Sequence, residues 1–334
     1  MATTFKNFLS NDLANTRTLL HEAIPVTGTI CSGTYTDNNI KEYGHGMFQS
    51  VYDYPHLSSS ANHIFDVTFG YHSTSTLQKA ASLQNTKKQN IYNQMAQTLV
   101  GHDITGSIKK FTTSAGVEIT DVLFVNFARL LTKDEIKKGS FSLTALTGGT
   151  AAAPNGAMVI TDTSGATGYR VDSPSGEYGY LYDASGYEKG ALYYQAGIAI
   201  LSGGIVFVNA FGAGDTTGDG GSYVHVATGS VINEVADGLR NKLTNVSFNN
   251  TTELNSTIYF CRVNHNDFNY SSNPTYLTGS KVRVKTMAAD APVSYLTTVG
   301  LYSADNELLA VAKLSEPLRK SSDTELTLRV RLDY

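Results

Sequence analysis

The sequence predicts an α+β protein that is mainly β, with a helix-containing N-terminal region followed by antiparallel β-sandwich or barrel-like modules. The first supporting observation is the C-terminal decapeptide, in which leucine or valine at 326, 328, 330 and 332 alternates with polar residues, the period of a half-buried strand. The second is a series of short strand-like runs separated by turn formers. The third is the composition, with 30 glycines, 20 tyrosines and no tryptophan.

Two helices are expected near the N-terminus. One covers residues 9–24, where apolar residues recur at helix-compatible spacing, and Pro25 closes it. The other covers residues 76–100, which contain no glycine or proline and place apolar side chains four apart from Ile91 to Leu99. This second segment is predicted to be the longest helix of the chain.

Three further segments of the N-terminal region carry local signals. Residues 64–69 are rich in β-branched and aromatic side chains and predict a strand. Residues 122–131 form a nearly continuous apolar run, which fits either a buried strand or a helix. Thr132 and Glu135 have the spacing of a capping box, which predicts a short helix that ends at Gly139.

The middle of the chain, residues 140–229, is dominated by glycine, serine, threonine, alanine and tyrosine. Strands are expected there at 157–160, 178–182, 191–201 and 204–211. The connections are glycine-rich, including 148–154 and 212–221, and such loops tolerate length. A helix at 231–243 then leads into the C-terminal module.

The C-terminal module is expected to consist of strands at 256–263, 281–285, 293–302, 308–314 and 326–333. The polar turn 303–307 folds two of them into a hairpin, and Pro317 is expected to end the second one. The last strand must be tied into a sheet, because a loose end would leave its apolar side chains in water. The predicted regions are 1–139, 140–229 and 230–334.

Composition bounds the class of protein. With 41% hydrophobic and 16% charged residues the chain is of a folded, globular type, and a net charge of −4 gives no basic surface that would indicate sequence-specific nucleic-acid binding. There is no signal-peptide pattern and no apolar run of about 18 residues, so a chain made in a cytoplasm and not inserted in a membrane is expected. Cys31 and Cys261 are expected to be small buried residues rather than a disulfide.

The most enzyme-like string is Gly212–Asp215, which matches the Gly-Ala-Gly-Asp core of ribokinase-type sugar kinases, with Asp215 in the place of their base. In that family the motif opens a helix, whereas here three glycines follow within the next few residues and disfavour one. Asp215 and Asp219 also supply oxygens for Ca²⁺, but the Asp-x-Asp-x-Asp spacing is missing, which favours a hairpin tip.

No other catalytic or metal-binding pattern is present. Seven of the eight histidines, at 45, 56, 63, 72, 102, 225 and 265, are scattered without zinc-site spacing. The asparagine-rich run 264–276 is expected to cap backbone groups in a long connection rather than to hold a ligand. We therefore expect no catalytic, cofactor-binding or metal-binding residues. Tyrosines are concentrated around the turn 183–186, and this residue is enriched where proteins meet proteins. These tyrosines are Tyr178, Tyr180, Tyr182, Tyr187, Tyr193 and Tyr194.

Four strings, 16–24, 268–276, 292–317 and 328–334, resemble the virion structural proteins of T-even-like myophages, the cyanophage type in particular. The resemblance implies a non-enzymatic structural subunit of a contractile-tail virion that is assembled in the host bacterial cytoplasm. It implies a place in the baseplate, with the neck or collar as the alternative, and homo- and hetero-oligomeric contacts with other virion subunits. No functional residue is carried over. The competing hypotheses are a receptor- or carbohydrate-binding module and, remotely, a sugar kinase acting through Asp215.

Overall fold

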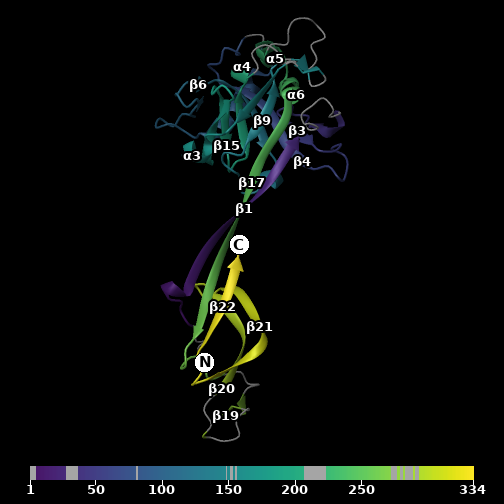
Figure 1. Ribbon diagram of the computed structural model, residues 1–334. Coiled ribbons are helices and arrows are strands. Elements are labelled where there is room, and N and C mark those ends of the chain that lie inside the picture. The colour runs from purple at the N-terminus through teal and green to yellow at the C-terminus, as the bar shows by residue number, and fades with distance from the viewer. Residues whose placement is uncertain are drawn as a thin grey trace. The chain divides into compact units, whose positions relative to one another are not determined.

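The computed structural model describes the chain over most of its length (Figure 1). The described residues are 5–27, 37–79, 82–147, 149–150, 153–154, 156–206, 223–271, 277–278, 281–282, 289 and 293–334. Strands hold 48% of the residues and helices 18%, and the main feature is a large antiparallel sheet. The predicted fold class, α+β and mainly β, is confirmed.

Internal contacts divide the chain into two units. Unit 1 consists of Met1–Leu19 and Glu253–Tyr334, and unit 2 of Leu20–Thr252. Both internal boundaries of the three regions expected from the sequence fall within unit 2. Two strands, β1 (Leu13–Thr27) and β17 (Leu243–Val263), contribute residues to both units.

Unit 2 is built on the large sheet. Its strands follow the spatial order β17-β9-β12-β14-β15-β16-β7-β4-β3-β2, while β8 pairs with β17 and β13 with β14. The bounds are β2 (Ile40–Glu42), β3 (Gln49–Tyr52), β4 (His63–Tyr71), β7 (Asp121–Phe127), β8 (Glu135–Ile136), β9 (Ser142–Leu146), β12 (Ala157–Thr161), β13 (Arg170–Ser173), β14 (Gly176–Asp183), β15 (Glu188–Tyr193) and β16 (Ile198–Ser202). Two separate short hairpins pair β5 (Phe111–Thr112) with β6 (Glu118–Ile119) and β10 (Gly149–Thr150) with β11 (Ala153–Pro154). The strands expected at 64–69, 157–160 and 178–182 are confirmed.

The helices of unit 2 are η2 (Asp37–Asn39), α1 (Asn85–Leu99), α2 (Arg129–Thr132), α3 (Gly165–Gly168), α4 (Gly203–Val206), α5 (Tyr223–Gly229) and α6 (Ile232–Lys242). The helix expected at 231–243 is α6. Both α1 and α6 pack on β4. Val122 and Phe124 of β7 lie in the apolar cluster that contains Ile91 of α1, whereas Leu123 and Val125 lie in the cluster that contains α6. The apolar run that begins at residue 122 is therefore a strand buried on both faces.

The predicted long helix is shorter than the segment from 76 to 100. Gln84 adopts a left-handed backbone conformation with φ +54°, so the helix begins at Asn85. The Gln84 side chain instead accepts a hydrogen bond from the backbone N–H of Ile232, at 3.0 Å. The expected helix from Thr132 to Gly139 is wrong as well, because Lys133, at φ +56°, ends α2 and the next residues form β8 against β17.

The helix expected over 9–24 is wrong. A short 3₁₀ turn, η1 (Ser10–Asp12), is followed by β1, which lies beside β17. Side-chain bonds join the two strands, from Thr257 to Asn15 at 2.9 Å and from Thr16 to the Ser256 carbonyl at 3.4 Å. Local propensity favoured a helix only weakly, and the pairing with a strand more than two hundred residues away overrides it.

Two strand predictions in the middle of the chain need correction. The segment 191–201 forms two strands, β15 and β16, separated by a turn in which Gly197 has φ +68°. The segment 204–211 begins as helix α4, and residues 207–211 lie outside the described part of the chain. The loop 212–221, with Asp215 and Asp219, also lies outside it, as does Cys31.

Unit 1 contains a three-stranded arrangement and a hairpin. The C-terminal strand β22 (Leu326–Asp333) pairs antiparallel with β17 from Ser256↔Asp333 to Val263↔Leu326, so the prediction that the C-terminus is tied into a sheet is confirmed. The hairpin consists of β20 (Val293–Tyr302) and β21 (Leu308–Ser321), joined by the expected turn (Figure 1). The last described pair, β18 (Leu277–Thr278) with β19 (Lys281–Val282), covers part of the strand expected at 281–285.

Pro317 does not end β21. The pairing of β20 with β21 shifts register between Leu296↔Leu318 and Thr298↔Lys313, so the proline lies in a bulge of β21. A bulge leaves residues outside the hydrogen-bond ladder, and proline has no N–H to contribute to that ladder. The strand therefore continues past Pro317 to Ser321.

Candidate functional site

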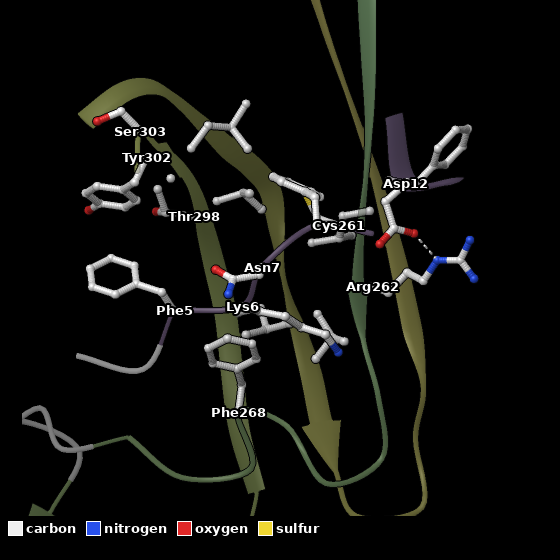
Figure 2. Close-up of a pocket in the computed structure, with 18 of the residues that line it drawn as sticks. Phe5, Lys6, Asn7, Asp12, Cys261, Arg262, Phe268, Thr298, Tyr302 and Ser303 are labelled. Atoms are coloured by element: carbon white, nitrogen blue, oxygen red, sulfur yellow. Dashed lines mark hydrogen bonds and ion pairs between the residues drawn. The ribbon is translucent and has the colours of Figure 1, made fainter. Parts of the chain in front are cut away.

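The candidate site is a cavity of about 430 Å³ inside unit 1 (Figure 2). One wall is strand β20, from Leu296 to Tyr302. The opposite wall is the end of β17, from Phe260 to Val263, together with Leu328 of β22. The N-terminal segment 5–8 lines the cavity between them. Most of this surface is apolar, so the cavity is suited to apolar or aromatic groups.

Aromatic side chains of the N-terminal segment lie against those of the strands. The Phe5 ring packs edge-on against Tyr302, with ring centroids 5.1 Å apart, and the Phe8 ring lies 5.5 Å from that of Tyr259. Phe5 nevertheless remains 47% exposed, and Tyr302 45% exposed. The aromatic lining is therefore only partly covered by the residues of unit 1 that the structure describes.

An ion pair between Asp12 and Arg262 lies on the other side of the cavity (Figure 2). The backbone N–H of Leu9 donates to the Asp12 carboxylate at 3.0 Å, and Asp12 N–H donates back to the Leu9 carbonyl at 2.9 Å, which closes the η1 turn. The hydrogen bond from Leu9 and the Arg262 guanidinium together hold the pKa of Asp12 below its ordinary value, although burial opposes them. Asp12 is therefore an anion that orders the turn, and its charge is already matched.

Cys261 carries the thiol group that lines the cavity. It is a free, half-buried thiol, and burial together with the nearby Asp12 carboxylate raises its pKa. A thiol with a raised pKa carries little thiolate at neutral pH, and the thiolate is the nucleophile. Cys261 therefore contributes a small apolar part of the wall, and it is half-buried rather than buried as the sequence predicted.

The described part of the asparagine-rich run caps backbone groups, as the sequence predicted. The Asp267 carboxylate accepts the N–H of Asn264 at 3.3 Å and pairs with Lys6, and the lysine lowers the pKa of Asp267. The Asn269 side-chain amide donates to the His265 carbonyl at 2.7 Å. The connection after β17 is thus held by its own side chains; residues 272–276 lie outside the described part.

A buried lysine anchors this connection to β21. Lys320 is fully buried, and its ammonium group donates to the His265 carbonyl at 3.1 Å, to Asn269 Oδ1 at 2.7 Å and to the Ser321 carbonyl at 2.7 Å. Three acceptors satisfy the three protons of the ammonium group. These hydrogen bonds of Lys320 hold the connection after β17 in place, in a unit with few buried apolar side chains.

Sequence reasoning missed the aromatic residues at the N-terminus and the pairing of tyrosines in unit 2. Tyr178 and Tyr193 are direct cross-strand partners, and Tyr180 lies on the same strand as Tyr178. Tyr178 and Tyr193 lie on either side of the turn at 183–186, but a register shift between Leu181 and Tyr182 means that their direct pairing could not be counted from the turn. No local signal existed for Phe5 and Phe8, whose partners are far away in sequence.

Among the described residues, no group of three or more histidine, cysteine, aspartate or glutamate side chains is placed to hold a metal ion. His63 pairs with Asp66 at 2.8 Å, and His265 with Glu325 at 3.2 Å. Within the same described ranges, no helix has the length and apolar character needed to cross a membrane. No family model, curated protein or solved structure matches the chain.

Proposed function

We propose that this protein is a non-enzymatic structural subunit of a tailed-phage virion, located in the baseplate of a contractile tail, and that unit 1 provides its assembly surface. The location rests on the resemblance of four strings to such proteins, with the neck or collar as the alternative. The observation that carries the assembly role is the burial pattern of unit 1. Among its described residues, the buried apolar side chains are Val263, Val293 and Leu301.

Among the described residues of unit 1, more large apolar side chains are exposed than buried. More than half of the exposed large apolar side chains of the described residues belong to unit 1, although it is the smaller unit. On β21, Leu309 is 67% and Val311 52% exposed, while the intervening Ala310 is half-buried. Apolar surface that is gathered in this way marks interaction sites. Covering each of these half-exposed side chains stabilises an assembly by about 1 kcal/mol.

The occupant of this surface is a second copy of the same chain. Basic and acidic residues of unit 1 are almost equal in number, so two copies do not repel each other strongly. Several of these charges are paired inside the unit, including Lys6 with Asp267 and Arg331 with Asp333. The hairpin itself carries both signs, for example Glu307 and Lys313, and a symmetric contact between copies can pair unlike charges.

Sedimentation of the full chain tests the assembly role. We expect wild type to sediment as an oligomer at micromolar concentration and Leu309→Lys to weaken association at least about tenfold, because a lysine would be buried without a partner. Leu57→Lys is the matched control, since Leu57 is 89% exposed but belongs to unit 2. A monomeric wild type, or equal weakening by both variants, would contradict the proposal.

Electron microscopy of purified particles tests the location. Density for this chain at the distal end of the tail supports the baseplate, and density at the head-proximal end supports the neck instead. Absence of the chain from purified particles, with the protein found only in the soluble lysate, would refute a virion role altogether.

A further inference from the structure

A second cavity, of about 550 Å³, lies in unit 2 and has a different lining. Tyr178 and Tyr193 of β14 and β15 form its aromatic wall. The remaining lining is mostly polar, with Asp172 and Ser173 from β13 and several residues from 103 to 118, and includes the apolar Val100 and Ile108. Its volume is in the range of small-ligand sites, which combine aromatic walls with a few polar groups.

The tyrosine rings form a fixed platform. The rings of Tyr178 and Tyr193 are stacked, with centroids 5.1 Å apart and an interplanar angle of 24°. Tyr180 meets Tyr178 edge-on, with centroids 5.8 Å apart. Tyr193 is only 3% exposed and belongs to the core cluster under α1, whereas Tyr178 is half-buried. The core therefore holds Tyr193 in place, and Tyr193 supports the Tyr178 ring from below.

Hydrogen-bonding groups surround this platform. The Asp172 carboxylate interacts with the Tyr178 hydroxyl, and burial raises the pKa of Tyr178, so the phenol keeps its proton. Lys110 and Glu118 form an ion pair at 2.7 Å beside it. Asp103 lines the cavity too, but its carboxylate already accepts bonds from Thr105 and Ser107.

The lining carries no excess of positive charge, because its two lysines face three carboxylates, those of Asp103, Glu118 and Asp172. Lys110 and Glu118 neutralise each other, and Lys109 and Asp172 have opposite signs. The pKa of His72 is lowered by burial and by nearby Lys110, so its ring is neutral at physiological pH. A nucleotide or another phosphate ester would require a clearly positive lining. The cavity therefore matches a neutral ligand with several hydroxyl groups and one flat apolar face.

We propose that this cavity binds a neutral saccharide, with the C–H face of a pyranose ring on Tyr178 and its hydroxyl groups bonded to Asp172, Lys110 and Glu118. A pyranose offers axial C–H bonds on one face and hydroxyl groups around its rim. The C–H face complements the aromatic wall of the cavity, and the hydroxyl groups complement its polar side chains. Weak contacts of C–H groups with an aromatic face add to the burial of apolar area. This site does not depend on the assembly role of unit 1.

The test is binding of the full-length protein to an array of neutral and N-acetylated oligosaccharides, followed by calorimetry with the strongest binder. We expect saturable binding that falls at least about tenfold in both Tyr178→Ala and Asp172→Ala and changes little between pH 6 and 8. Tyr187→Ala is the control, because Tyr187 lies just after the same turn, is 68% exposed and does not line the cavity.

Asp172 is exposed, so its replacement keeps the test decisive even if Tyr178→Ala fails to fold. The proposal is overturned if no oligosaccharide on the array binds, or if Asp172→Ala binds as tightly as wild type. Stronger binding of anionic than of neutral sugars would overturn it as well.

Discussion

Replacement of the buried Lys88 by methionine probes the electrostatics of the α1–α5 contact. Lys88 of α1 is fully buried, and its ammonium group donates to the carbonyls of Ala227 and Ser230 at 2.7 and 2.8 Å. These carbonyls lie at the C-terminal end of α5, where a positive charge is favourable. Burial nevertheless lowers the pKa of Lys88 from 10.5 to about 8, while Glu234 acts in the opposite direction.

The direction of the pH dependence follows from this shift. Between pH 8 and 10.5 the unfolded chain holds the Lys88 proton and the folded chain does not, so the Lys88 contribution to stability rises with pH across that window. Between pH 7 and 9.5, the range used in the experiment, the Lys88 contribution to the free energy of unfolding rises by about 2 kcal/mol. Methionine cannot titrate. The difference in unfolding free energy, wild type minus Lys88→Met, should therefore increase by about 2 kcal/mol over this range.

Urea unfolding of the full chain followed by circular dichroism, at pH 7.0 and at pH 9.5, measures this difference. Lys87→Met is the matched control, because Lys87 is the preceding residue of α1 and is exposed, with its ammonium group on the His45 carbonyl at 2.9 Å. The change with pH measured for Lys87→Met is the baseline for that of Lys88→Met. If the Lys88→Met difference changes with pH no more than this baseline, the reasoning from the burial of Lys88 is wrong.

Two further substitutions test the packing of each unit by thermal and urea unfolding. Gly70→Ala should destabilise unit 2 by about 3 kcal/mol, because a Cβ there would lie 2.7 Å from the backbone nitrogen of Tyr92. Gly44→Ala is the control and should be near neutral, because the space around Gly44 is open. Equal effects of the two substitutions would contradict the close approach of α1 to β4. Lys320→Met should destabilise unit 1 by about 3 kcal/mol through the loss of three hydrogen bonds. Lys313→Met is the control, because Lys313 is exposed. An unchanged free energy of unfolding in Lys320→Met would show that these hydrogen bonds do not stabilise unit 1.

The parts of the fold that were predictable from sequence are those set by local pattern. The hairpin of β20 and β21 could be located because a polar turn separates two runs rich in strand formers, and β22 because its alternation extends over eight residues. The helix α6 has apolar residues at regular helical spacing and was located within one residue at each end. In these segments the nearest neighbours in sequence decide the structure.

Elements defined by distant partners were not predictable in the same way. The strand β1 lies beside β17, and the residues of β1 alone do not indicate that partner. The start of α1 depends on the left-handed Gln84, a conformation that is uncommon for a residue with a side chain. The candidate site in unit 1 combines the N-terminal segment with β20 and β17, which only the folded chain brings together.

The alternating pattern of β22 also shows where sequence reasoning about function reaches its limit. Its leucines and valine at 326, 328, 330 and 332 are half-buried, and the residues between them are exposed. In β4, Phe65, Val67 and Phe69 also occupy alternate positions, but there they are almost fully buried. Pattern alone therefore separates inner from outer faces but does not report whether the chain itself supplies enough cover. Burial does report it, and under the proposed assembly a second copy of the chain covers the exposed apolar side chains of unit 1.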